Sequence, residues 1–208
     1  MNHVALLGDS IFDNRAYVAS APDVSTQLRA ELGTAWKVSL VAVDGRVTQD
    51  VRDRQLNRLP DGISHIVISV GGNDALGQAS ILGEGARSVA EAIDRLAEAQ
   101  ARFARSYESM ANAVVALGLP VAVCTIYDAN YPEPQRRLVV SALSFFNDVI
   151  MRTAFSRRLP VVDLRLICSA PADYANPIEP SAQGGEKIAR VIAALVRSVS
   201  AERSSIWT

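Results

Sequence analysis

Short apolar runs recur along the chain, and each ends at glycine or at polar residues. Runs of this length and composition predict buried β-strands. Between them lie longer stretches with an apolar residue at every third or fourth position, which is the spacing of a helix that buries one face. Repeated strand–helix units are typical of a parallel sheet covered by helices. The expected strands begin near residues 3, 36, 64, 119 and 160.

The helical segments carry start and stop signals. Thr48 stands where an N-cap belongs, Pro134 fits a first helical turn, and Gly33 ends the first helix. The expected helices cover residues 24–32, 48–59, 75–118 (as one helix or two), 134–158 and 183–199.

The order of the elements predicts the fold class. Strand–helix alternation with right-handed crossovers favours a three-layer α/β/α architecture, with five parallel strands in the order 2-1-3-4-5. A chain of 208 residues can bury one substantial α/β core but falls short of two. Because no linker or low-complexity tract interrupts the pattern, residues 1–208 are expected to form a single domain.

Charge and composition narrow the partners. The chain has 21 basic and 22 acidic residues and a net charge of −1, which argues against nucleic acid and favours a small-molecule ligand. No stretch approaches the ~20 apolar residues of a membrane span, so we expect no stable membrane insertion and a cytoplasmic location. Cys124 and Cys168 lie in apolar segments, and their spacing is not that of a metal or redox motif. We expect both to be buried as small hydrophobic residues.

Polar residues follow three successive strands. Ser10 comes directly after Gly8 and Asp9, Gly45 follows the second strand, and Asn73 follows the third. Taken singly, each is compatible with a cap or a turn. Taken together at one edge of a parallel sheet, they suit acyl transfer, because a serine nucleophile needs backbone N–H groups and an uncharged amide to stabilise the developing oxyanion.

These residues lie in blocks that resemble the SGNH, or GDSL, hydrolase family over almost the whole chain. The blocks are residues 7–10 (Leu-Gly-Asp-Ser), 43–48, 70–74, and Pro180-Ser181 followed by Gly184 and Ile188-Ala189. The resemblance implies a flavodoxin-like sheet and no cofactor or metal. It makes Ser10 the nucleophile and assigns the oxyanion to the Ser10 and Gly45 N–H groups and Asn73. The implied substrates are esters, as in esterases, lipases, thioesterases, lysophospholipases and carbohydrate deacetylases.

One block departs from the family pattern. Where the family has Asp-x-x-His-Pro, this chain has Asn176 and Glu179 in the aspartate and histidine positions. The two histidines, His3 and His65, lie at strand beginnings and therefore opposite the site, so an ordinary Ser-His-Asp triad is not expected. Glu179 is then the candidate base, held by an amide hydrogen bond from Asn176. A glutamate base would need its pKa raised from ~4.3 toward ~6–7 by burial.

Three functions stay open on the sequence alone. The chain could be a hydrolase or acyltransferase that uses Glu179, a scaffold that binds an acyl or carbohydrate ligand without turnover, or an interaction module presenting Tyr131 and Trp207. Glu179 itself could instead be a loop residue that caps the last helix. Residues expected to shape a substrate pocket are Asp9, whose main role is expected to be structural, Ile11, Phe12, Asp13, Tyr127, Asp128 and Tyr131.

Overall fold

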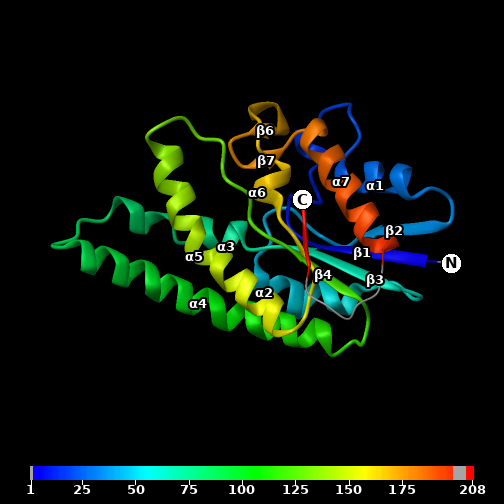
Figure 1. The fold of residues 1–208 in the computed structure, drawn as a ribbon, viewed down its shortest axis with the longest axis horizontal. Helices are drawn as coiled ribbons and strands as arrows, with labels where there is room; N and C mark the ends of the chain where they lie inside the picture. Colours follow the sequence, from blue (N-terminus) through cyan, green and yellow to red (C-terminus); the bar gives the residue numbers. More distant parts are fainter. Residues whose placement is uncertain (1, 199–204) are drawn as a thin grey trace.

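The computed structural model describes residues 2–198 and 205–208, and its centre is a parallel sheet in the order β2-β1-β3-β4-β5-β8 (Figure 1). The five expected strands and their order are confirmed, and every pairing among them is parallel. The edge strand β8 was not predicted, since a two-residue strand leaves no periodic signal. The strands are β1 (Asn2–Gly8), β2 (Trp36–Leu40), β3 (His65–Ser69), β4 (Val121–Cys124), β5 (Val161–Val162) and β8 (Ile206–Trp207).

Helices cover both faces of this sheet, which gives the predicted three-layer architecture (Figure 1). The helices are α1 (Val24–Leu32), α2 (Thr48–Asp50), α3 (Gly72–Leu76), α4 (Val89–Val115), α5 (Gln135–Ser156), α6 (Leu164–Ile167) and α7 (Ala182–Arg197). Shorter turns are η1 (Arg15–Tyr17), η2 (Val51–Gln55, a π-helical turn), η3 (Leu56–Arg58), η4 (Ala79–Gly83) and η5 (Pro171–Asp173). A separate antiparallel hairpin joins β6 (Tyr174–Asn176) to β7 (Glu179–Pro180).

The first strand shows how the core is divided. Successive side chains of a strand point to opposite faces of the sheet. Val4 and Leu6 accordingly pack on the side of α1 and α7, whereas Ala5 and Leu7 pack on the side of α4 and α5. All four are fully buried, so β1 lies in the middle of both cores and its carboxyl end is held firmly.

Some local expectations were wrong. Val47 rather than Thr48 is the N-cap of α2, and residue 199, the expected end of the last helix, lies outside the described residues. Trp207 is half-buried in β8, where it packs against the core, rather than presented for an interaction.

Among the described residues, helix α5 is the one helix that is long and apolar enough to span a membrane by length and composition alone, a test that a core helix also passes. Leu143, Phe146 and Ile150 on this helix are buried, whereas Leu138 is 54% exposed. The buried stripe of α5 therefore begins about one turn after Leu138.

Candidate active site

The chain reaches Ser10 through a tightly constrained strand end. Gly8 has a φ of +127°, and a Cβ added there would lie 1.7 Å from the carbonyl oxygen of Ser69. The buried side-chain amide of Gln55 accepts a 2.7 Å hydrogen bond from the Gly8 N–H and donates another of 2.7 Å to the Gly8 carbonyl. Gln55 thus replaces a neighbouring strand and fixes the backbone two residues before Ser10.

Ser10 meets Glu179 at the carboxyl edge of the sheet. The Ser10 hydroxyl donates a 3.0 Å hydrogen bond to Glu179 Oε1, and the two residues are only 6% and 5% exposed. The second carboxylate oxygen, Oε2, is buried and has no hydrogen-bond partner among the described residues. The hairpin β6–β7 therefore presents a buried acid directly to the serine, as the sequence predicted.

Burial changes the acidity of both carboxyl groups near Ser10. It raises the pKa of Glu179 to about 7; the hydrogen bond from Ser10 opposes this rise, and the charge of Asp44 adds to it. Burial likewise raises the pKa of Asp9 to about 8, with the Ile11 N–H opposing and Glu179 adding. At neutral pH the protonated and ionised forms of Glu179 are thus comparably populated, which suits a group that takes up and returns a proton.

Buried contacts hold the Glu179 hairpin in place. Asn14 donates a 3.3 Å hydrogen bond from Nδ2 to the Pro180 carbonyl, and its Oδ1 accepts one of 3.0 Å from the Val24 N–H. The Tyr127 hydroxyl donates to the carbonyl of Ile178 at 2.5 Å. Sequence reasoning missed both Asn14 and Gln55, because single amides in a loop and in an irregular helix carry no pattern.

Asn73 also lines the site. Its amide nitrogen donates a 3.1 Å hydrogen bond to the Arg46 carbonyl, and the amide carries a second hydrogen besides the one used in this bond. The neighbouring Asp74 accepts hydrogen bonds of 2.9 and 3.0 Å from the Thr48 N–H and hydroxyl. The hydrogen bonds of Asn73 and Asp74 thus join the loop after β3 to the loop after β2.

Gly45 stands apart from this group. It is exposed in the turn after β2, with a φ of +75°. It is not among the described residues that line the cavity beside Ser10. Its role as an oxyanion donor therefore stays a prediction.

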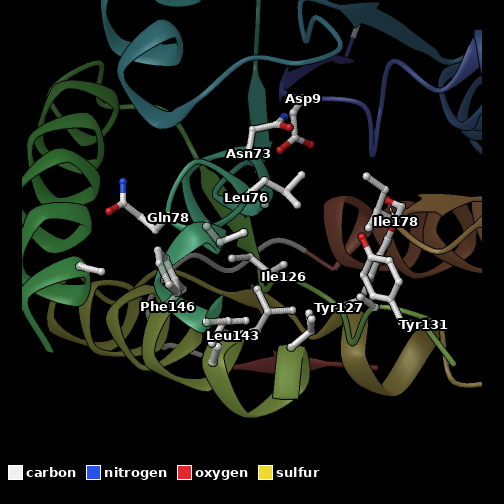
Figure 2. Close-up of a pocket in the computed structure, with 18 of the residues that line it drawn as sticks. Asp9, Asn73, Leu76, Gln78, Ile126, Tyr127, Tyr131, Leu143, Phe146 and Ile178 are labelled. Atoms are coloured by element: carbon white, nitrogen blue, oxygen red, sulfur yellow. Dashed lines mark hydrogen bonds between the residues drawn. The ribbon is translucent and has the colours of Figure 1, made fainter. Parts of the chain in front are cut away.

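A cavity of about 380 Å³ opens beside Ser10 and Glu179. Its walls come from the loop after β1, the segment from α3 through η4, the strand end after β4, and helices α4 and α5. Of the expected pocket residues, Asp9, Ile11, Tyr127 and Tyr131 line it. Figure 2 shows Asp9 beside Asn73 at one end and Leu143 beside Phe146 at the other.

Four expectations about individual residues were wrong. Phe12 is fully buried in the core on the side of α1 and α7. Asp13 accepts a 3.0 Å hydrogen bond from the Asp44 N–H and so ties two loops together. Asp128 lines a separate surface hollow with Arg136. Asn176 is exposed and accepts a 2.9 Å hydrogen bond from the Ile178 N–H, because the two-residue turn directs its side chain to its own backbone instead of to Glu179.

The histidines lie where the sequence placed them. His3 and His65 occupy the amino-terminal parts of β1 and β3, at the opposite end of the strands from Ser10. His3 Nε2 is hydrogen-bonded to the Ser39 hydroxyl at 2.8 Å, and His65 Nδ1 to the Ser64 hydroxyl at 2.9 Å. Across residues 2–198 and 205–208, no group of three His, Cys, Asp or Glu side chains is placed to hold a metal ion.

Sequence comparison matches residues 6–187 to the GDSL-like lipase/acylhydrolase family. The match covers most of the chain, and the chain belongs to this family of hydrolases. Comparison with curated protein sequences gives no significant match.

Solved structures of similar fold include esterases and lipases. A lipase from a goat rumen metagenome has a TM-score of 0.71 at 17% identity, covering 98% of this chain and 99% of that one. A phospholipase A1 from Streptomyces albidoflavus has a TM-score of 0.67 at 20% identity, covering 95% and 98%. A carbohydrate acetylesterase from Sinorhizobium meliloti has a TM-score of 0.63 at 15% identity, covering 95% and 99%. At these identities the likeness establishes the fold alone.

Proposed function

We propose that the protein is a serine esterase in which Glu179 replaces histidine as the general base. The observation that carries the proposal is the 3.0 Å hydrogen bond from the Ser10 hydroxyl to Glu179 Oε1 at the edge of a cavity. A nucleophile and a base in this relation are the minimum for covalent acyl transfer. The raised pKa of Glu179, about 7, supports a role in proton transfer near neutral pH.

The reaction follows from these positions. Ser10 Oγ attacks the ester carbonyl carbon while its proton passes to Glu179. The carbonyl oxygen gains negative charge and accepts hydrogen bonds from the Ser10 N–H and the Asn73 amide. Collapse of the tetrahedral intermediate breaks the bond to the alcohol oxygen, which receives the proton from Glu179. Water then attacks the acyl-serine and gives its proton to Glu179. As the bond to Ser10 Oγ breaks, Glu179 returns this proton to Ser10 Oγ, and release of the acid restores both residues.

The asparagine at position 176, where the family has aspartate, is consistent with a glutamate base. A protonated histidine carries a positive charge that an aspartate stabilises, whereas a protonated glutamate is neutral. A second carboxylate beside Glu179 would only repel its ionised form. Asn176 adds no charge to the hairpin, and its side chain is turned to its own backbone rather than to Glu179.

A covalent probe tests the proposal. A fluorophosphonate should label the wild-type protein at Ser10, and nitrophenyl esters should be hydrolysed at rates that disappear in Ser10→Ala. Ser144→Ala, which changes an exposed serine on α5, should be labelled like the wild type. If neither labelling nor hydrolysis depends on Ser10, the protein is a ligand-binding scaffold and the esterase proposal is wrong.

A further inference from the structure

The cavity beside Ser10 extends well beyond the reacting atoms. It passes from Asp9 and Asn73 to Leu143 and Phe146, between η4 and helices α4 and α5 (Figure 2). One water molecule occupies about 30 Å³ in the liquid. At this volume per heavy atom, a cavity of about 380 Å³ holds on the order of a dozen heavy atoms. An acetyl group at Ser10 would leave most of this space unfilled.

The chemistry of the walls changes along the cavity. Asp9 and Glu179, at the reacting end, are the only ionisable carboxyl groups among the lining residues that the structure describes, and no lysine, arginine or histidine lines it. Farther from Ser10 the walls are mainly aliphatic and aromatic, with contributions from Ile81, Leu96, Ala99, Val139, Leu143 and Phe146. An apolar chain would be stabilised here by burial, whereas a carboxylate would lose its hydration and find no positively charged side chain among the described lining residues.

The mouth of the cavity points to the same ligand. Leu76, Leu82 and Leu138 line the cavity and are 44%, 42% and 54% exposed. They come from α3, η4 and α5, so three separate elements each bring a partly exposed apolar side chain to the cavity. A chain that enters past them removes apolar surface from water at the rim as well as inside.

We propose that this cavity binds the acyl chain, so that the preferred substrates are esters of uncharged, medium-chain fatty acids rather than acetyl esters. The inference rests on the proposed function, because it takes Ser10 as the point of attack.

A series of nitrophenyl esters tests the acyl preference. From acetyl to octanoyl, kcat/KM should rise by up to about fourfold per methylene and by about 10²-fold or more in total. The mono-nitrophenyl ester of octanedioic acid has the same chain length but ends in a carboxylate, and should react at least about 10²-fold more slowly than the octanoyl ester. Equal or higher kcat/KM for acetyl, or for the carboxylate-ended ester, would overturn the inference while leaving the esterase proposal intact.

A cavity-filling variant locates the preference. Ala142 lies on α5 next to Leu143 and lines the cavity, so Ala142→Phe should lower the octanoyl-to-acetyl ratio of kcat/KM by about tenfold or more. Ala101→Phe adds the same side chain to an exposed position of α4 and should leave the ratio unchanged. A ratio that Ala142→Phe does not lower would contradict the assignment of this cavity.

Binding of octan-1-ol separates this inference from the esterase proposal. Calorimetry should detect octan-1-ol binding to the wild type and to Ala101→Phe, with at least tenfold weaker binding to Ala142→Phe. Binding without ester turnover would support the acyl cavity and count against the esterase proposal. If the wild type hydrolyses esters but does not bind octan-1-ol, the inference fails and the esterase proposal stands.

Discussion

Asn14 donates a hydrogen bond to the carbonyl of Pro180, and this contact joins the segment after the nucleophile to the hairpin that carries the acid. Asn14 is fully buried, and its Oδ1 also accepts a hydrogen bond from the first residue of α1. The distance between Ser10 and Glu179 therefore depends on Asn14, although Asn14 is hydrogen-bonded to neither residue.

Asn14→Ala should weaken both the fold and the site. It leaves the buried Val24 N–H and Pro180 carbonyl without partners, which costs about 1–3 kcal/mol of unfolding free energy. Urea unfolding measures this loss, and kcat for an ester substrate should fall because Glu179 is less firmly positioned. Asn57→Ala removes an amide from an exposed site and should change unfolding by less than about 0.5 kcal/mol. Equal stability of the two variants would contradict the role of Asn14.

Glu179→Gln should separate catalysis from packing. Glutamine keeps an oxygen that can accept the Ser10 hydrogen bond but cannot take up the proton, so kcat should fall about 10²–10⁴-fold. Wild-type kcat/KM should rise with pH through about 7 as the base ionises, and the residual rate of the variant should lose this step. An unchanged rate in Glu179→Gln would show that the carboxylate is only a structural contact.

The same pKa predicts how stability depends on pH. The pKa of Glu179 is about 7 in the fold, above its ordinary value of 4.5, because burial disfavours the ionised form. Between these pH values the folded protein binds more protons than the unfolded chain, so the free energy of unfolding contributed by this group falls as pH rises. The stability difference, Glu179→Gln minus wild type, should therefore increase from pH 4.5 to pH 7 and then level off. A flat difference, measured by urea unfolding, would mean that Glu179 has an ordinary pKa.

The sequence predicted the parts of this molecule that depend on periodicity. The strand order followed from apolar runs and crossover handedness, and the meeting of Ser10 with Glu179 followed from a motif register. Side-chain directions in loops could not be predicted in the same way. Phe12 and Asp13 are neighbours of Ile11, yet only Ile11 faces the cavity, because the turn after β1 directs each side chain differently. The apolar cavity was also missed, since it forms between α4, α5 and η4, which are distant in the chain.

Gln55→Ala provides the last prediction, because Gln55 supports the strand end from which Ser10 projects. The substitution removes two buried 2.7 Å hydrogen bonds. It leaves the Gly8 N–H without a partner, whereas the Gly8 carbonyl keeps a 3.2 Å hydrogen bond from the Val43 N–H. The expected loss is about 1–3 kcal/mol of unfolding free energy, because one buried N–H group is left unsatisfied. Fluorophosphonate labelling of Ser10 should also slow, since the backbone before the nucleophile becomes mobile. Gln49→Ala is the matched control: its amide bonds to Asp53 on the exposed surface, and its loss should leave both stability and labelling close to wild type. Slower labelling in Gln49→Ala as well would show that the effect does not arise at Gly8.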